Sequence, residues 1–196
     1  MEHPNYSPLA QFPMASAGCR VLDEHNPLPV RGDSPALDVM TDLAKIPAAT
    51  IAPNDLLSDA NQSMLLRGVR LLLVTTDDDE ICGVIATADF LGPKPVHVAE
   101  QLGVMRHELR VRDVMTPVDQ VQVLRFTEVT GAKVGHIVAT LKAVTRVHAL
   151  VVEEVAGQEV LRGIFSASQI ARQLGIPVVS HEVARTFNEI DALIGT

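Results

Sequence analysis

The sequence predicts an α+β fold built from two tandem domains, each with the element order β-α-β-β-α. The first observation is a repeat, because the tetrapeptide "DVMT" occurs at residues 38–41 and again at residues 113–116. The second is that apolar β-prone runs and helix-periodic segments follow each copy in the same order. The third is that a chain of 196 residues with 47% hydrophobic content can bury a sizeable core. Duplication of a small domain explains the repeat and the shared order of elements, and the composition allows the chain to fold.

The first half opens with a short β-prone segment at residues 48–53. A helix is predicted over residues 54–68, because an apolar stripe repeats at helical spacing and Gly68 is a typical end residue. The stripe consists of Leu57, Ala60, Met64 and Leu65. The apolar runs at 69–76 and 81–87 then flank an acidic turn, and a second helix begins within residues 88–92. The predicted order is β-α-β-β-α.

The second half repeats this order. A strand is predicted at residues 121–124, and an apolar stripe marks a helix over residues 134–144. Residues 147–154 and 158–165 read as a hairpin, and a closing helix over residues 166–175 ends at Gly175. Loop insertions absorb the small difference in length between the halves.

These segments divide the chain into four parts. Residues 1–33 are rich in proline and without periodicity, so we expect an extended or partly disordered arm. Residues 34–108 form the first domain and residues 109–177 the second. Residues 178–196 carry one apolar stripe and predict an amphipathic helix. Such a helix needs a surface to cover, and we expect the chain to be a homodimer.

Composition and charge exclude several classes of function. The formal net charge is −8 and the basic residues are scattered, so no nucleic-acid partner is expected. No apolar run is long enough to span a membrane and the first residues do not resemble a leader, so we expect a cytoplasmic protein. The cysteines, Cys19 and Cys82, are isolated, so neither a metal site nor a metal cofactor is predicted. No catalytic triad or phosphate loop can be argued from spacing, and we do not expect an enzyme.

Six segments together resemble a known family. They are the two "DVMT" openings, "RGVRLLLV" and "TRVHALVV" before the second strands, and "GVIATAD" and "GIFSASQ". Over about residues 37–177 they are similar to the cystathionine β-synthase (CBS) domain in its tandem arrangement, the Bateman module. The resemblance implies two domains packed through their sheets about a pseudo-twofold axis. It also implies dimerisation and adenosine-type ligands, such as AMP, ADP, ATP or S-adenosylmethionine, in the clefts between paired domains.

The resemblance extends to a ligand motif, G-h-h-[ST]-x-x-[DN], in which h is apolar. In the family the hydroxyl reaches a ligand phosphate and the last residue accepts the two ribose hydroxyls, for which a carboxylate is well suited. In the first half Gly83 is followed by Ala86 at the hydroxyl position, by Thr87 one place late, and by Asp89 in register. The ribose group is kept, whereas the phosphate hydroxyl is lost or shifted.

The second half keeps the opposite part of the motif. Ser166 is in register, but Gln169 stands where the carboxylate belongs. The Asp89 cleft is therefore expected to be the stronger site. An alternative interpretation makes Asp89 a helix N-terminal residue and Ser166 or Ser168 a helix cap. By the same resemblance, adenine would lie against the first strand of each half, at Ala48, Ala49 and Thr50 and at Gln120, Val121 and Gln122.

His148 is a further candidate, because the family often has a basic residue facing the cleft near this position. A surface histidine at a strand end is the alternative. Two functions follow from the sequence. One is a non-catalytic regulatory module for signal transduction that senses an adenosine-type ligand and acts on an unknown regulated protein. The other is a ligand-free dimeric interaction scaffold whose ligand sites have decayed.

Overall fold

The computed structural model of the chain describes residues 29–176 and Ile190. Most of the predicted arm (1–33) and most of the predicted C-terminal helix (178–196) lie outside these residues, as does Cys19. Of the arm, only residues 29–33 are described. Ile190, from the predicted helix, is fully buried in the core of the second half.

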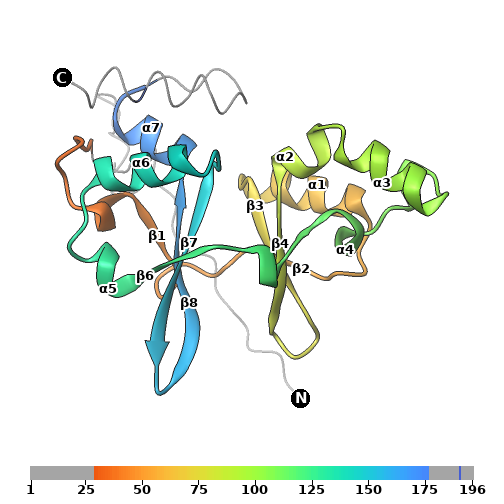
Figure 1. The fold of residues 1–196 in the computed structure, drawn as a ribbon, viewed down its shortest axis with the longest axis horizontal. Coiled ribbons are helices and arrows are strands. Elements are labelled where there is room, and N and C mark those ends of the chain that lie inside the picture. Colours follow the sequence, from red (N-terminus) through yellow and green to blue (C-terminus); the bar gives the residue numbers. More distant parts are fainter. Residues whose placement is uncertain (1–28, 177–189, 191–196) are drawn as a thin grey trace, which may run out of the picture.

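Two small sheets form the centre of the molecule, and the helices cover the outer side of each sheet (Figure 1). The order of strands is β2-β3-β4-β5 in one sheet and β1-β8-β7-β6 in the other. This mixed α+β architecture confirms the predicted fold class.

The first half follows the predicted order and adds one helix. Gly68 ends α1 with a φ of 64°, a left-handed conformation that glycine adopts without steric cost. The helix predicted to begin at 88–92 is short, and a separate helix that the sequence analysis did not predict follows Pro93. The elements are β2 (Thr50–Ile51), α1 (Leu57–Arg67), β3 (Leu71–Thr75), β4 (Ile81–Ala86), α2 (Thr87–Leu91), α3 (Lys94–Leu102) and the 3₁₀ helix η2 (Arg106–Glu108).

The second half repeats this pattern with a longer hairpin. Its predicted strand at 121–124 is observed two residues later, and its predicted helices lie within the expected ranges. The elements are η3 (Val118–Gln120), β6 (Val123–Arg125), α5 (Phe126–Val129), α6 (Val134–Ala143), β7 (His148–Val155), β8 (Gln158–Ser166) and α7 (Ala167–Gln173).

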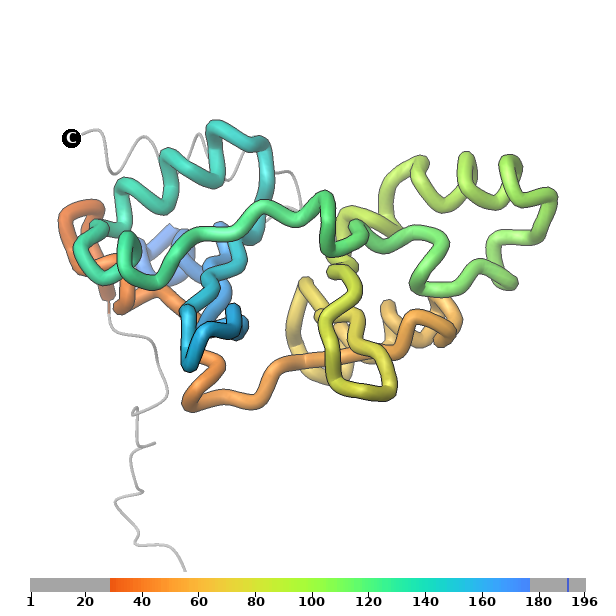
Figure 2. The backbone as a smooth tube through the Cα atoms, turned by 60° about the horizontal axis from the view of Figure 1, so that its bottom comes forward, coloured from red at the N-terminus to blue at the C-terminus, as the bar shows by residue number. Residues whose placement is uncertain are grey.

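Each "DVMT" segment joins the sheet of the half that it does not directly precede in the sequence. The first copy lies in η1 (Ala36–Val39) and β1 (Met40–Asp42), and β1 pairs with β8 of the second half. The second copy lies in α4 (Val111–Val114) and β5 (Thr116–Pro117), and β5 pairs with β4 of the first half. The chain therefore passes between the halves twice, through residues 43–49 and through residues 118–122 (Figure 2). The sheet of the first half is therefore completed by β5, which precedes the second half in the sequence. The sheet of the second half is completed by β1, which precedes the first half.

A matching irregularity in the two hairpins supports the internal repeat. The pairing of β3 with β4 shifts between Val74 and Thr75, and Cys82 is left out of the register. The pairing of β7 with β8 shifts between Val151 and Val152, and Arg162 is left out. Each bulged residue directly precedes the glycine of its half's ligand motif. Because the two hairpins share this register, Leu71, which pairs with Ala86, corresponds to His148, which pairs with Ser166.

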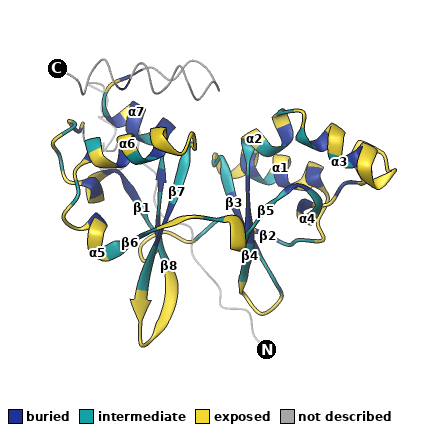
Figure 3. Ribbon diagram, in the orientation of Figure 1, coloured by how far each residue is buried: buried dark blue, intermediate teal, exposed yellow. Residues whose placement is uncertain are grey.

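Buried side chains form one core in each half and a smaller cluster between them. The third cluster joins Leu73 and Val84 from the first sheet to Leu150 from the second, with Ala48 and Val121 packed against it. Figure 3 shows buried residues along the central strands and exposed residues at the hairpin tips. The two sheets thus meet through apolar side chains, and any cleft between the halves borders this contact.

Candidate functional site

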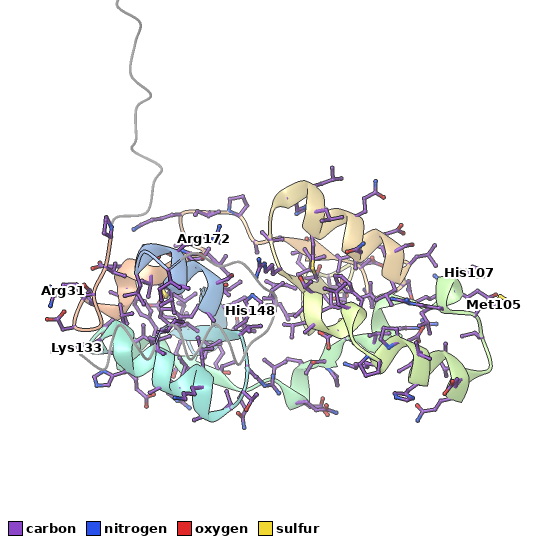
Figure 4. The ribbon with its side chains drawn as sticks, turned by 90° about the horizontal axis from the view of Figure 1, so that it is seen from above. Arg31, Met105, His107, Lys133, His148 and Arg172 are labelled. Carbon is purple, nitrogen blue, oxygen red and sulfur yellow. The ribbon has the colours of Figure 1, made fainter. Side chains whose placement is uncertain are left out.

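A cavity of about 220 Å³ lies between the halves, beside the apolar inter-sheet cluster. It unites five residues that the sequence analysis singled out: Ala86 and Asp89 from the first half, and Val121, Gln122 and His148 from the second. Figure 4 shows His148 at the middle of the molecule, between the two halves. The other lining residues are Leu71, Val84, Ala88, Thr116, Thr145, Arg146, Val147 and Leu150.

Asp89 is held rigidly at this cavity. One carboxylate oxygen, Oδ2, accepts a hydrogen bond of 2.8 Å from the backbone N–H of Ala86, and the other, Oδ1, lies 3.0 Å from Lys94 Nζ. The helix-terminal interpretation of Asp89 is thus satisfied by its contact with Ala86. A carboxylate has about four lone-pair positions, so these two contacts leave room for two more donors. Asp89 can therefore hold α2 in place and still accept a diol.

His148 is neutral at physiological pH. Burial, and to a smaller extent the charge of Arg70, lower the pKa of its imidazole from 6.5 to about 4, and the carboxylate of Asp89 opposes this shift. One ring nitrogen of a neutral imidazole donates a hydrogen bond and the other accepts one. His148 therefore offers the cavity a polar group without a charge.

Thr87 does not replace the missing hydroxyl of the first half. Its Oγ1 donates to the backbone oxygen of Arg70 at 3.3 Å and lies 3.5 Å from Met64 Sδ. It is not among the residues that line the cavity. Ala86, which does line it, has no hydroxyl.

The polar groups of the second motif are engaged by other side chains of the protein. Gln169 Oε1 accepts a hydrogen bond of 3.2 Å from the hydroxyl of Thr41, which belongs to the exchanged first "DVMT" segment. Ser166 Oγ and Ser168 Oγ lie 3.0 Å apart. Ser166 occupies the N-cap position of α7 without a side-chain capping bond. These contacts leave fewer polar atoms for a ligand than the Asp89 side offers.

The remaining predicted residues lie outside the cavity. Ala48 packs in the inter-sheet cluster, Ala49 against the core of the first half, and Thr50 is exposed in β2. Gln120 is exposed at the end of η3. Gly83 is buried where β4 pairs with β5. It lies so close to Met115 and Thr116 that a side chain at this position would collide with them. Its role in the structure is close strand packing.

Sequence reasoning missed several residues of the cavity, above all Thr116 and Arg146. Thr116 is the last residue of the second "DVMT" copy, so the repeat itself could have indicated it as a site residue. Its counterpart Thr41 contacts Gln169, and the exchange of segments places Thr116 in the lining with Asp89. Arg146 carried no signal in the sequence beyond its charge.

Within residues 29–176 and Ile190, no group of three or more His, Cys, Asp or Glu side chains is arranged to hold a metal ion. None of the helices in this part of the chain has the length and apolar character needed to cross a bilayer.

Comparisons with known proteins bear on the fold. The family model of the CBS domain matches residues 36–92, whereas no curated protein matches the chain. A conserved protein from Pyrococcus horikoshii has a similar structure, with a TM-score of 0.54 and 17% identity over 77% of this chain and 99% of that one.

Two further solved structures are similar. The CBS-domain containing protein ATU1752 from Agrobacterium tumefaciens has a TM-score of 0.52 and 16% identity, over 73% of this chain and 94% of that one. CBSX2 in complex with AMP has a TM-score of 0.51 and 21% identity, over 71% of this chain and 94% of that one. At these identities the likeness shows a shared fold.

Proposed function

Because residues 36–92 are a CBS domain and the chain has the fold of a CBS-domain pair, we propose that it is a non-catalytic regulatory module of the cytoplasm that senses an adenosine-type ligand. The ligand would occupy the cavity between the halves, and a partner protein would read the resulting change. No reaction is assigned to the cavity residues.

One observation carries this proposal: the cavity brings together residues of both halves. They are Ala86 and Asp89 from the ligand motif of the first half, and Val121, Gln122 and His148 from the second half. Asp89 provides a fixed carboxylate with free lone pairs, which suits the vicinal hydroxyls of ribose. Val84, Val121 and Leu150 provide apolar walls for a base. CBSX2, which shares the fold, was solved with AMP, and this supports a nucleotide as the ligand.

A ligand in this cavity would contact both halves at once. The halves are joined by two crossing segments and by the apolar cluster around Leu73 and Leu150. A ligand that binds better to one relative position of the halves shifts the population towards that position. This is how binding would be transmitted to a regulated partner.

A ligand-free interaction scaffold is the second candidate, and the second motif favours it. There the hydrogen bond from Thr41 to Gln169 and the contact between Ser166 and Ser168 satisfy polar groups within the chain. If the Asp89 cavity were likewise only a packing defect, the protein would present its surfaces to partners without sensing a small molecule.

A thermal-shift screen of the full chain separates the two candidates. We expect adenosine or one of AMP, ADP, ATP and S-adenosylmethionine to raise the melting temperature, because a ligand at 100 times its dissociation constant stabilises the folded state by about 2.7 kcal/mol. Guanosine and GMP serve as matched controls for the base. No shift with any adenosine compound at millimolar concentration would reject the sensor and favour the scaffold.

A further inference from the structure

A second cavity, of about 410 Å³, lies on the helical side of the first half and shares no lining residue with the Asp89 cavity. Figure 4 shows His107, one of its lining residues, at the end of the first half away from His148. Its floor consists of Leu57 and Phe90, each only 5% exposed. Its exposed lining residues are Ser58, Asn61, Leu91, Arg106 and His107. We call this cavity, with its apolar floor and mostly polar rim, the α1 groove.

The internal repeat identifies the corresponding positions of α6 in the second half. Leu57 and Val134 are the first residues of α1 and α6, and in each half the residue before the helix forms an isolated bridge to a segment distant in the sequence. Leu57 therefore corresponds to Val134. Four residues further on, Asn61 corresponds to Val138.

The following helices, α2 and α7, are matched by the ligand motif. Phe90 and Ile170 each lie four residues after the hydroxyl position of the motif in their half, so they correspond to one another. The next residues, Leu91 and Ala171, correspond as well. All four matched positions of the first half line the α1 groove.

In the second half these four positions are covered. Val134, Val138, Ile170 and Ala171 are all buried, and they share one core cluster with Ile190. Ile190 is helical, fully buried, and comes from the last part of the chain. In the first half, by contrast, Asn61 and Leu91 are exposed. The α1 groove is thus the open counterpart of a face that the second half buries together with an isoleucine from a distant helical segment.

The sequence around Ile190 indicates which kind of segment suits such a face. Glu189 precedes Ile190 and Asp191 follows it, so an apolar side chain stands between two carboxylates. Grooves between helices commonly bind amphipathic helices, and a buried apolar side chain then acts as the anchor.

The charge of the α1 groove matches a segment of this kind. Arg106 Nη2 donates a hydrogen bond of 3.0 Å to Phe90 O, which holds the guanidinium beside the floor and leaves other N–H donors available. Within residues 29–176 and Ile190, no carboxylate forms an ion pair with Arg106. Glu108 accepts the N–H of Met105 at 2.8 Å, and neither Glu108 nor Asp59 lines the groove. The groove therefore offers a positive charge on a chain whose net charge is −8.

We propose that the α1 groove is a docking site for an acidic amphipathic helix of a partner protein. The helix places an apolar side chain on Leu57 and Phe90 and a carboxylate against Arg106, where the hydrogen bonds are charge-assisted. The occupant belongs to another protein, because Ile190 of this chain is already buried in its own second half. This inference goes beyond the proposed function and does not depend on the ligand of the Asp89 cavity.

The probe that tests the inference is a fluorescent synthetic peptide with the sequence of residues 183–195, which contains Ile190 and its two acidic neighbours. The full chain is titrated into it without nucleotide, and fluorescence anisotropy reports binding. A second peptide carries Glu189→Lys and Asp191→Lys. At about 0.15 M salt, charges further apart than about 8 Å are largely screened. Any remaining non-specific attraction to the acidic chain favours the second peptide, and so works against the expected result.

Three variants of the full chain are compared with the wild type. Arg106→Glu reverses the charge of the groove, and Asn61→Trp fills the groove from an exposed position. Arg67→Glu is the matched control, because Arg67 is an exposed residue of α1 outside the groove and the net charge changes equally. The melting temperature of each variant without peptide shows that it is folded. Asn61→Trp keeps the test decisive if Arg106→Glu, which loses the bond to Phe90 O, does not fold.

We expect the wild type and Arg67→Glu to prefer the unmodified peptide. Arg106→Glu should bind that peptide about threefold or more weakly, and should bind the lysine peptide more tightly than the wild type does. Asn61→Trp should lose roughly tenfold or more, because the anchor can no longer reach the floor.

Three results would overturn the inference. One is that the wild type does not bind the unmodified peptide at about 100 μM. Another is that Arg106→Glu and Asn61→Trp bind it as the wild type does, because the peptide would then occupy a different surface. The third is a change of mass in light scattering for either groove variant, because a second copy of the chain would then occupy the groove. Each of these results leaves the proposed function standing, since no nucleotide takes part in the measurement.

Discussion

The sulfur atom of Met40 lies against Gly163, so that a Cβ atom at Gly163 would be only 2.5 Å from Met40 Sδ. The same relationship holds in the other half, where a Cβ at Gly83 would be 2.8 Å from Met115 Sδ and 2.7 Å from the backbone oxygen of Thr116. Each "DVMT" methionine therefore occupies the space that a motif glycine leaves free in the opposite half. This contact explains why the two motifs occur together and twice.

Substitution of Gly83 by alanine should destabilise the protein. The new methyl group would meet a backbone oxygen of β5, which cannot move without disturbing the pairing of Val84 with Thr116. Overpacking of this kind costs about 1–3 kcal/mol, which for a chain of this size lowers the melting temperature by roughly 2–4 °C per kcal/mol. Gly131→Ala is the matched control, because a Cβ there has no atom within 4 Å. Equal melting temperatures for the two variants would contradict this explanation.

Arg162 should be essential for the attachment of the exchanged strand β1. Its guanidinium contacts Asp42 of β1, lies 3.0 Å from Glu153 of β7, and stands 4.8 Å from the centre of the Phe126 ring. In Arg162→Met the Asp42 carboxylate would keep only the exposed Lys45, at 3.5 Å, as a counter-charge, and breaking a buried pair on one side costs about 3–5 kcal/mol. Because these groups are partly exposed, we expect a loss below that range, measured by urea unfolding. Arg125→Met, at an exposed position of β6, should change stability by less than 0.5 kcal/mol.

The sequence predicted the elements of this fold well because its helices and strands are strongly periodic. Leu57, Ala60 and Met64 of the predicted stripe are buried as expected, and Gly68 ends the helix. Leu65, the fourth residue of that stripe, is instead 75% exposed. The helix α3 was missed because Pro93 and Gly92 read as an interruption. Local patterns also carry no information about pairing partners, so nothing in "DVMT" alone indicated that β1 would join the sheet of the other half.

The candidate site was predictable only where a motif fixed the register. Asp89, Ala86, Val121, Gln122 and His148 were singled out from the sequence, and the structure places them in the lining of one cavity. Whether a given hydroxyl faces the cavity depends on backbone contacts that no motif contains, and the bond from Thr87 to Arg70 O is an example. Ala48 and Thr50 were assigned from the resemblance, whereas their positions depend on how the two sheets pack. These differences arise at the level of tertiary packing.

His148 should make the protein less stable at mildly acidic pH. Its pKa falls from 6.5 to about 4 on folding, so between these values the unfolded chain binds more protons than the folded one. Its contribution is complete above pH 6.5, is lost as the pH falls towards 4, and amounts to about 3 kcal/mol at most, less because the ring is partly accessible. Arg70 strengthens this shift and Asp89 weakens it.

The variant His148→Leu isolates this effect, because Leu71 stands at the matching position of the other half. Urea unfolding of both proteins at pH 7 and pH 5 should show a smaller pH dependence for the variant. The carboxylates titrate in both proteins, so their contribution cancels when the two pH dependences of the unfolding free energy are subtracted. Identical pH dependence would show that His148 does not titrate in this window.

Dimerisation should use the outer face of α1. Leu65 and Leu66 are 75% and 79% exposed, and Leu91 of the neighbouring helix α2 is 62% exposed. Single exposed leucines are ordinary, but a group of this kind favours the homodimer that the sequence predicts. We expect light scattering to give a dimer mass for the wild type and a monomer mass for Leu65→Glu/Leu66→Glu. Val118→Glu, at an exposed position of η3, is the control. A monomer mass for the wild type at micromolar concentration would rule the dimer out.

Asp89→Ala should lose adenosine-type ligands, whereas Ser166→Ala should retain them. The Asp89 carboxylate lines the cavity and can accept the ribose hydroxyls, and a hydrogen bond to a charged group contributes about 1.5–3 kcal/mol, so its loss costs roughly tenfold or more in affinity. Asp89 also accepts the N–H of Ala86, so the variant loses a helix-terminal contact and about 1 kcal/mol of stability. Lys94→Met removes the ion pair at Asp89 without removing the ribose acceptor, and it should retain adenosine binding. Calorimetric titrations of the three variants decide the matter: if Ser166→Ala abolishes binding and Asp89→Ala leaves it intact, the ligand occupies the other cleft.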